Sequence, residues 1–382
     1  MAKVWWNEYE EMYLQAMQYW KMFQNGKTMK QKEIIRFFKD YEKTAVTKLI
    51  FESNTIEKEG LSEADTKRIV FEGFESLDND IVSVAETATN MFMGSLDPCL
   101  KIKVNAEKIK SGLSGLSVIF QSKQKEYLQV SNQLIAMLIV RGHAISFDLK
   151  THLRKMSESK FREFLNCVTE DDDRKLYVKL RSESSYALLT QELLKEIHKK
   201  LAEEQDNNDN GLPGEYRAQG AFINFSTVFI EPSLVEKAVK KFIDEHNWRI
   251  NHSDMFNPIL EACKISADIV RIHPFGDFNG RSSRIILNMV LLAHELPFYL
   301  VLRGDGSHRK KYITAMKQYF KNGNLKGYIA FVCKTFVEQI REINKQLRMA
   351  NVNQLVPEIL SEQDRELLLK ELEYYLEISR DI

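Results

Sequence analysis

An all-α fold with one short β-hairpin is predicted for this 382-residue chain, and three observations predict it. The chain has only 16 glycines and seven prolines, so residues that break helices interrupt few of its segments. Apolar residues recur at helical spacing through most of the length. A single stretch, AQGAFINFSTVFIEPS at 218–233, is instead rich in Phe, Ile, Val and Thr, the residues that strands favour.

Helical periodicity sets the order of the expected elements. In the first helix, WWNEYEEMYLQAMQYWKMFQ, aromatic residues recur at helical spacing. Ser62 is followed three positions later by Asp65, and Ser361 by Asp364; such pairs resemble the capping boxes that open helices. The expected helices cover 5–24, 30–52, 63 onward, 80–94, 103–140, 147–168, 188–205, 234–247, 255–272, 281–295, 309–320, 324–349 and 362–378.

The series of helices is interrupted once. The stretch DNNDNGLPGEYR at 206–217 is a loop by composition, and it leads into the strand-like segment 218–233. Asn224, Ser226 and Thr227 can form a tight turn inside that segment. We therefore expect a small hairpin there, standing alone in a helical protein.

Composition argues against several classes of protein. Lysine and arginine together number 54, as do aspartate and glutamate, so the formal net charge is zero and general nucleic-acid binding is disfavoured. The most apolar run, LIAMLIV at 134–140, is too short to cross a bilayer. No secretory signal is visible at the N-terminus. We expect a cytoplasmic protein that neither enters a membrane nor binds nucleic acid.

The stretch HPFGDFNGRSSR at 273–284 concentrates polar residues between two apolar helical segments. His273 precedes a proline, which disfavours the α conformation, so the first helix should end there. Gly276 and Gly280 permit backbone geometries that other residues resist. The second helix should begin near Arg281, and it should be buried because it is apolar nearly all round.

Two arginines stand where a helix usually prefers acidic residues. The first turn of a helix exposes unpaired N–H groups and the positive end of the dipole. Arg281 and Arg284 are three positions apart and therefore share one face. A polyphosphate would satisfy both guanidinium groups and the N–H groups of the glycine-containing loop. The stretch predicts a phosphate site; the alternative is that these residues simply cap a helix junction.

Three further side chains fit the phosphate interpretation. Asp277 offers the hard oxygen ligands that suit a Mg²⁺ ion bridging phosphates. Asn279 can orient a phosphate oxygen or shape the loop. His273 should face the same pocket with a pKa near neutral, which suits a general base, an effect worth roughly 10²–10⁴ in rate.

The stretch resembles the signature of the Fic domain family, His-Pro-Phe-x-Asp-Gly-Asn-Gly-Arg-x-x-Arg, and departs from it at one position, where Phe278 stands in place of the usual glycine. The resemblance implies a Fic-type helical core and Mg-dependent transfer of AMP from ATP to a hydroxyl side chain of a protein target. His273 would deprotonate the hydroxyl and Asp277 would hold Mg²⁺. Phe278 is costly if its position needs a positive φ. The nucleotide-binding residues that the resemblance implies are Gly276, Phe278, Asn279, Gly280, Arg281 and Arg284.

The resemblance covers about 186–335 and includes the hairpin. In the family this hairpin is a flap that aligns the target segment by main-chain pairing, and an exposed strand edge is physically suited to that role. From its residues alone, a plain structural ribbon is the alternative. The docking residues implied for the flap at 221–230 are Phe222, Ile223, Asn224 and Phe225.

The stretch SNTIEKEGLS at 53–62 resembles an inhibitory helix found in many family members, with the pattern Ser/Thr-x-x-x-Glu-Gly/Asn. Its glutamate pairs with the second signature arginine. Glu57, counted from Ser53, fits the wider context and is favoured, whereas Glu59, counted from Thr55, fits the pattern literally. The two glutamates would lie about 200° apart on a helix, so only one should face the pocket. An ordinary solvated turn is the alternative.

Four regions are expected along the chain: 1–79 with the inhibitory motif, 80–185 with no assigned role, the catalytic core 186–335, and the C-terminal helices 336–382. The leading hypothesis is an ATP-using protein adenylyltransferase inhibited by its own N-terminal glutamate. The alternatives are removal of AMP or transfer of another phosphate-containing group by the same site, or a helical interaction protein with a vestigial nucleotide site. Self-modification and homo-oligomer formation stay open.

Overall fold

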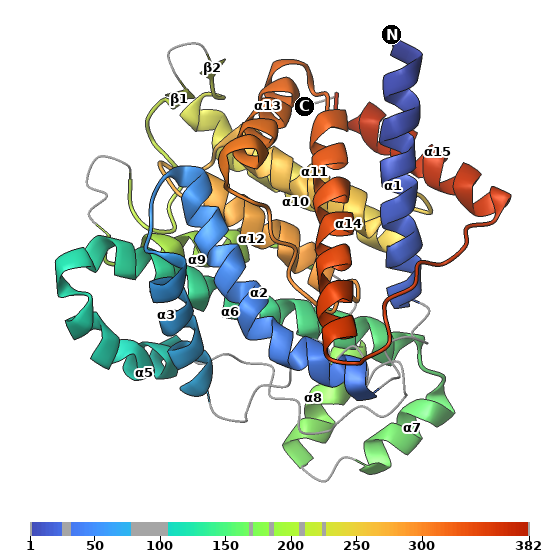
Figure 1. The fold of residues 1–382 in the computed structure, drawn as a ribbon, viewed down its shortest axis with the longest axis horizontal. Coiled ribbons are helices and arrows are strands. Elements are labelled where there is room, and N and C mark those ends of the chain that lie inside the picture. Colours follow the sequence, from blue (N-terminus) through green and yellow to red (C-terminus); the bar gives the residue numbers. More distant parts are fainter. Residues whose placement is uncertain are drawn as a thin grey trace.

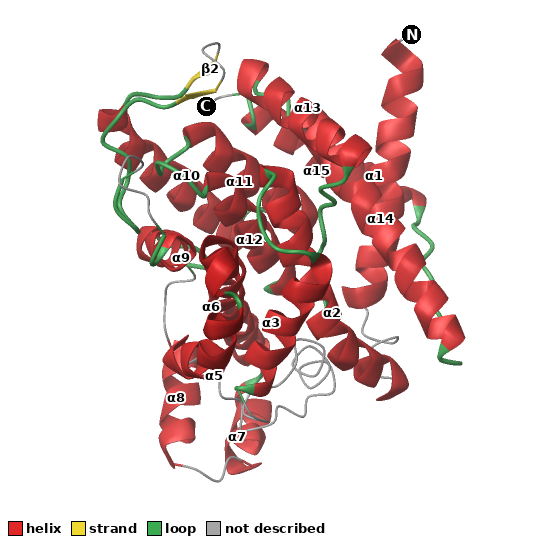
Figure 2. Cartoon of the chain, turned by 60° about the vertical axis from the view of Figure 1, so that its left-hand side comes forward, coloured by secondary structure: helices red, strands yellow, loops and turns green. Residues whose placement is uncertain are grey.

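The computed structural model describes residues 2–24, 32–77, 106–167, 171–182, 187–205, 211–223 and 227–380. These residues form helices with short connections and one two-stranded antiparallel hairpin. The predicted all-α class with one hairpin is therefore confirmed (Figure 2). The expected helix at 80–94 lies outside the described residues. No helix in the described ranges is long and apolar enough to cross a membrane.

The centre of the fold is the helix pair α11 (Pro258–Ile272) and α12 (Asn279–Leu292), which pack closely against each other. Asn257 caps α11, because its side-chain oxygen accepts the N–H groups of the first turn. Every residue of α12 except Gly280 is buried. The nearly uniform apolar character of this helix therefore predicts its central position correctly.

Helices from both ends of the chain surround this pair (Figure 1). Helix α1 (Ala2–Gln24) packs along α14 (Lys326–Met349) and also contacts α15 (Glu362–Ile378). Helix α2 (Lys32–Glu57) contacts α12 and packs against α3 (Glu63–Glu75). The end of α2 and the turn before α3 are thereby brought to the start of α12.

Two helix starts follow the predicted capping residues. The hydroxyl of Ser62 accepts the N–H of Asp65 at 3.2 Å. The hydroxyl of Ser361 accepts the N–H of Asp364 at 3.1 Å, and the Asp364 carboxylate accepts the N–H of Ser361 at 3.2 Å, which completes a capping box. The first of these caps fixes where the turn after α2 ends and α3 begins.

The middle of the chain differs from its prediction. The expected helix at 103–140 is interrupted at Phe120, and the following helix continues without a break to Lys155. Its residues keep the helical path because they are buried against other helices, which outweighs the cost of the glycine at 142. A helix at 171–182 was not predicted. The helices of this region are α5 (Ala106–Ile119), α6 (Gln124–Lys155), α7 (Glu158–Cys167) and α8 (Asp171–Ser182).

The remaining elements flank the loop that joins α11 to α12. The hairpin pairs Phe222 with Val228 and Ile223 with Thr227, so its strands are much shorter than the segment 218–233 suggested. Helix α6 packs on both α12 and the helix that precedes the hairpin. These elements are α9 (Gln191–Ala202), β1 (Phe222–Ile223), β2 (Thr227–Val228), α10 (Pro232–His252) and α13 (Gly306–Asn322).

Candidate active site

The loop between α11 and α12 is closed by one asparagine. Helix α11 ends at Ile272 as predicted, and His273 follows it in the left-handed region (φ 52°, ψ 59°). The side chain of Asn279 accepts the N–H of Phe275 at 3.0 Å and donates to the Phe275 carbonyl at 2.8 Å. Asn279 was expected either to orient a phosphate oxygen or to shape the loop, and these two contacts shape the loop. Helix α12 begins at Asn279, two residues before the predicted start at Arg281.

Phe278 has a left-handed backbone (φ 57°, ψ 7°) directly before α12. A residue other than glycine held there costs ~1–3 kcal/mol, so the position does favour glycine. The buried ring makes contacts that offset part of this strain. Its centroid lies 4.0 Å from the guanidinium carbon of Arg281, and it stands edge-on to the imidazole of His198 with centroids 6.1 Å apart. Phe278 thus forms the surface on which Arg281 rests.

The two glycines of the loop do not have the role predicted for them. Neither Gly276 nor Gly280 has a positive φ, so neither is required for an unusual backbone geometry. A Cβ on Gly280 would instead lie 2.5 Å from Oε1 of Glu57 and 3.2 Å from Nη1 of Arg284. Gly280 therefore allows charged side chains to approach the first turn of α12 closely.

Arg284 is almost completely buried and is held by the end of α2. Its Nη2 lies 2.7 Å from Oε1 of Glu57. Its Nε donates to the hydroxyl of Ser53 at 2.9 Å, and Nη2 donates to the Ser53 carbonyl at 3.1 Å. Burial alone would raise the pKa of Glu57, but the Arg284 guanidinium outweighs it and lowers that pKa. The carboxylate is therefore charged, and it occupies the face of α12 on which an anion was expected.

Glu59 also reaches a signature arginine, which contradicts the expectation that only one glutamate faces the pocket. Helix α2 ends at Glu57, and Lys58 turns the backbone into the left-handed region (φ 63°), so the angular argument for a continuous helix does not apply. Oε2 of Glu59 lies 3.3 Å from Nη2 of Arg281. Oε2 also accepts from Nε2 of Gln129 on α6 at 2.6 Å.

Both arginines keep buried N–H groups without a hydrogen-bond partner among the described residues. These groups are Nε and Nη1 of Arg281 and Nη1 of Arg284. A buried donor left unsatisfied costs ~1–3 kcal/mol, and more when it is charged. Burial lowers the pKa of Arg281, but an arginine side chain is not deprotonated in proteins, so the group is a cation. The face therefore retains donors and positive charge suited to an anion.

The imidazole of His273 stacks on the ring of Phe229, with ring centroids 4.0 Å apart. Its buried Nδ1 has no hydrogen-bond partner among the described residues. Burial lowers the pKa of His273 to about 4, whereas a value near neutral was expected from the sequence. Desolvation, which the sequence does not show, is the reason. The imidazole is consequently neutral at pH 7 and able to accept a proton.

Asp277 is exposed at the edge of the loop. Its Oδ1 accepts the N–H of Phe278 at 2.6 Å, which leaves Oδ2 available as one ligand for a cation. One carboxylate is a normal contribution to a Mg²⁺ site in which phosphates and water supply the other ligands. The donor set therefore fits Mg²⁺ that arrives together with a phosphate group.

Arg217 connects the loop to the hairpin region and was not singled out from the sequence. Its backbone N–H donates to the Pro274 carbonyl at 2.9 Å, and its Nε donates to the His273 carbonyl at 2.7 Å. Its Nη1 and Nη2 donate to the carbonyls of Gln219 and Ile230. One side chain thus ties the segments on both sides of the hairpin to the residue proposed as the base.

A cavity of about 310 Å³ lies between the hairpin and the loop, and His273 is among its lining residues. The side chain of Phe222 is 60% exposed and that of Val228 78%, so the hairpin presents apolar groups to solvent. Asn224, Phe225 and the side chain of Ile223 lie outside the described residues. The other lining residues are Gly211, Arg217, Ala218, Gln219, Gly220, Ala221, Phe222 and Gly276.

Two more residues near the loop carried little signal in the sequence. His198 on α9 stacks on Phe275 with ring centroids 3.8 Å apart, and its Nδ1 accepts the N–H of Gly214 at 2.9 Å. Burial lowers the pKa of His198 to about 4, so it supports the loop as a neutral ring. Arg309 on α13 donates to the carbonyl of Ile56 at 2.6 Å. No local pattern marks Arg309, because the contact joins segments far apart in the chain.

Comparison with known proteins finds a family model and several proteins to which the region around this loop is similar. The sequence model described as the Fic/DOC family matches residues 188–291. A Fido domain-containing protein of Dictyostelium discoideum is 28% identical over 119 residues, which are 31% of this chain and 82% of that protein. A protein named protein adenylyltransferase Fic of Aedes aegypti is 31% identical over 78 residues, 20% of this chain and only 15% of that protein.

A solved structure of similar extent is a Fic domain containing signaling protein from Bacteroides thetaiotaomicron. It is 14% identical, and the match covers 96% of this chain and 98% of that one with a TM-score of 0.49. The matches to proteins named as adenylyltransferases cover between 15% and 29% of those proteins. The chain therefore spans less than a third of the length of those proteins.

Proposed function

Residues 188–291 carry a Fic/DOC family domain, and from that premise we propose that the protein transfers AMP from ATP to a hydroxyl side chain of a protein target. The observation that carries the proposal is the buried, partly unsatisfied pair Arg281 and Arg284 at the N-terminal end of α12. Such a pair needs an anion, and a triphosphate supplies several charges and acceptors in one ligand.

The arginines and the helix end would hold the phosphates. Arg281 and Arg284 would bind the β- and γ-phosphates, which leaves the α-phosphate toward the loop and His273. The first N–H groups of α12 would donate hydrogen bonds to further phosphate oxygens. Gly280 has no Cβ and so keeps that surface open. Asn279 and Phe278 hold the loop and the Arg281 guanidinium in place, and Gly276 contributes to the cavity wall.

His273 would act as the general base. Its neutral ring would take the proton of the target hydroxyl as that oxygen attacks the α-phosphate, and pyrophosphate would leave with the electrons of the broken P–O bond. Arg217 holds the His273 carbonyl and therefore fixes the backbone of the base. A base with a pKa of about 4 is weak, so contacts of the imidazole with the bound substrates would have to raise that pKa.

Asp277 would hold the metal ion. When bound with ATP, Mg²⁺ neutralises phosphate charge and helps to orient the leaving group. In this chain the contribution to its binding would come from the exposed Asp277 carboxylate, whose Oδ1 is already oriented by the N–H of Phe278.

The hairpin would present the target. An extended peptide could pair with the β1 or β2 edge, while the exposed side chains of Phe222 and Val228 contact its side chains. The cavity beside the hairpin would then receive the target hydroxyl next to His273. We include Ile223, Asn224 and Phe225 in this docking proposal from their sequence positions.

The end of α2 would inhibit the reaction. The Glu57 carboxylate forms an ion pair with the Arg284 guanidinium, and the Glu59 carboxylate forms one with Arg281. Because Glu57 Oε1 lies beside Gly280, it also fills space next to the helix end where a phosphate would bind. We propose that both glutamates must withdraw before ATP can bind productively, with Glu57 as the main contact.

Mass spectrometry of the purified chain after incubation with ATP and Mg²⁺, alone and with a lysate, tests the proposal. We expect a protein that gains one AMP moiety, and we expect the Glu57→Gly variant to produce more of it. Release of AMP from a modified target without any addition would show that the site works in the removal direction. If Mg²⁺–ATP does not bind even to Glu57→Gly, the proposed function is wrong.

A further inference from the structure

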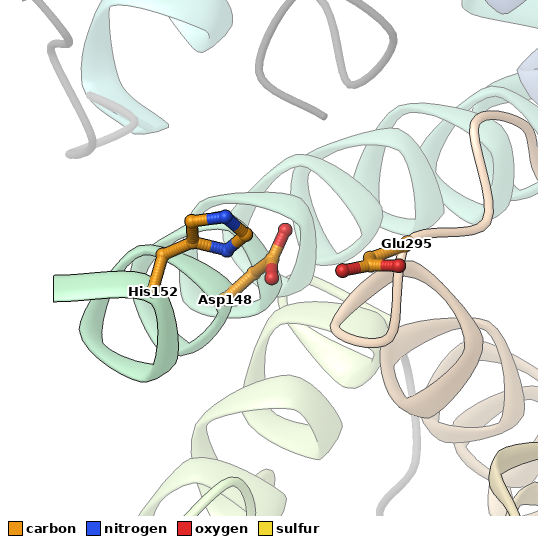
Figure 3. A group of neighbouring side chains, drawn as sticks. All are labelled: Asp148, His152 and Glu295. Carbon is orange, nitrogen blue, oxygen red and sulfur yellow. The ribbon is translucent and has the colours of Figure 1, made fainter. Parts of the chain in front are cut away.

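A second group of polar side chains lies away from the loop, where α6 approaches the end of α12. Asp148 and His152 are four positions apart on α6 and therefore lie on neighbouring turns of one face. Glu295 belongs to the turn that follows α12. One possible ligand atom from each of the three lies within 4.8 Å of the other two. Figure 3 shows Asp148 between His152 and Glu295, with its carboxylate directed toward Glu295.

The Asp148 carboxylate is buried without a counter-ion. Its residue is only 6% exposed, and no hydrogen bond or ion pair within the described ranges contacts its side chain. Its nearest charged neighbour in the group is Glu295, another carboxylate. Burial, and secondly the Glu295 charge, raise the pKa of Asp148; burial also raises that of Glu295. Lys155 attracts both acids but makes no ion pair with either.

Such an arrangement is unfavourable for a protein alone. A buried charge normally pairs with an opposite charge or coordinates a metal ion, and like charges brought together raise the cost. Two carboxylate oxygens and an imidazole nitrogen are together the ligand types that Zn²⁺ takes in proteins. Three protein ligands would also leave one position of a tetrahedral shell for water. A hard cation such as Mg²⁺ would make poor use of the imidazole.

We propose that Asp148, His152 and Glu295 bind one divalent transition-metal ion, with Zn²⁺ preferred. The bond lengths of about 2.0–2.2 Å in such a site require the three ligand atoms to move closer together than they stand here. Small rotations of the Asp148 and Glu295 side chains supply that movement. The site shares no residue with the proposed nucleotide site, so its existence does not depend on the proposed reaction.

The position of the site suggests what the ion would do. Asp148 and His152 lie in the last third of α6, whose earlier part contacts Glu59 through Gln129. Glu295 lies directly after α12, whose first turn carries Arg281 and Arg284. A bound ion would therefore join the far ends of the two helices whose near ends meet at the arginines. It would act as a structural clamp between the middle region and the core.

Zinc binding to the untagged full chain tests the proposal directly. The protein is stripped with a chelator, and Zn²⁺, Mn²⁺ and Mg²⁺ are titrated separately by calorimetry, without nucleotide, in the Asp277→Ala background that removes the proposed Mg²⁺ ligand. We expect one equivalent of Zn²⁺ to bind, and to bind more tightly than Mn²⁺ and much more tightly than Mg²⁺. Zn²⁺ should also raise the melting temperature.

Two variants test the carboxylate ligands, and a third serves as the control. Asp148→Asn and Glu295→Gln should each weaken Zn²⁺ binding at least about 100-fold, since even indirect supports of metal ligands contribute about 10–100-fold. Asp244→Asn, which changes an exposed acid of α10, should leave it unchanged. In the chelator, Asp148→Asn should melt no lower than the parent because it removes a repelling charge. Should that variant fold poorly, the less buried Glu295→Gln carries the comparison.

Several results would overturn the proposal. Absence of saturable Zn²⁺ binding, together with a higher melting temperature of Asp148→Asn in the chelator, would mean that the two carboxylates only share a proton. Equal affinity for Zn²⁺ and Mg²⁺ would exclude the imidazole as a ligand. Tight Zn²⁺ binding that survives both Asp148→Asn and Glu295→Gln would place the ion elsewhere.

Discussion

Replacing Glu57 by glycine should make the protein less stable and more active at once. Arg284 is 1% exposed and the Glu57 side chain 34% exposed, and their charged atoms are 2.7 Å apart. At an effective dielectric constant of 20, this separation corresponds to ~6 kcal/mol of attraction before desolvation is counted. Measured couplings for close charge pairs are ~1.5–7 kcal/mol. Because Glu57 is partly exposed, we expect a coupling energy near the low end of this range, about 2 kcal/mol.

That coupling sets the expected size of both effects. Without the glutamate, ATP should bind about 30-fold more tightly, since about 1.4 kcal/mol corresponds to a factor of ten. In the absence of ATP, the free energy of unfolding should fall by about 2–3 kcal/mol, because Arg284 is then buried without its counter-ion. Saturating ATP should restore much of the lost stability, since the triphosphate takes the place of the carboxylate.

The assay compares ATP affinity, AMP incorporation per hour and melting temperature for three variants. Glu52→Gly is the matched control, because Glu52 lies on the same helix and accepts the N–H of Gly304 at 2.7 Å but contacts neither arginine. Glu57→Gln separates charge from volume and should give an intermediate gain. If Glu57→Gly and Glu52→Gly have the same ATP affinity and the same rate, the end of α2 does not inhibit the site.

Four further outcomes are expected. Glu59→Gly should also activate, but less than Glu57→Gly, since its arginine contact is longer at 3.3 Å; an unchanged rate would limit inhibition to Glu57. His273→Ala should abolish AMP transfer and leave Mg²⁺–ATP binding nearly intact, and residual transfer near the parent rate would exclude it as the base. Asp277→Ala should weaken ATP binding with Mg²⁺ but not without it, as titrations in both conditions would show. The buried His198 has a pKa of about 4 in the folded protein, below its value in the unfolded chain. The unfolded chain therefore binds the proton first, and the free energy of unfolding decreases as pH falls from about 6.5 toward 4. The expected decrease in the free energy of unfolding is about 2 kcal/mol between about pH 7 and pH 5. Urea unfolding at both pH values should show a smaller decrease for His198→Phe than for the parent.

The helix pair at the centre was predictable because local patterns specify it. A nearly uniform apolar run predicts the burial of α12, and His273-Pro274 predicts the end of α11. Caps such as Ser62 and Ser361 are equally local, and the structure follows them. The break at Phe120 and the length of α6 were not predictable, since they depend on which surfaces of distant helices cover them.

The contacts of the two glutamates show where a local argument fails. The prediction that only one of them faces the pocket assumed that both lie on one continuous helix. Lys58 and Gly60 instead have positive φ, and they turn the chain after Glu57. Gly60 was visible in the sequence as a signal for such a turn. The link from Glu59 to Gln129 joins residues 70 positions apart, and no pattern in either segment indicates the other.

Because of Arg217, the sequence of the hairpin can change without a change in the position of the His273 backbone. Its guanidinium fixes the carbonyls of Gln219 and Ile230 and the carbonyl of His273 in one frame, using backbone acceptors that any amino acid can supply. The side chains between those two anchor carbonyls are therefore free to diverge. Under the proposed docking role, mutation in that interval would change which target segment binds without moving the His273 backbone, whereas loss of Arg217 would disturb binding of every target.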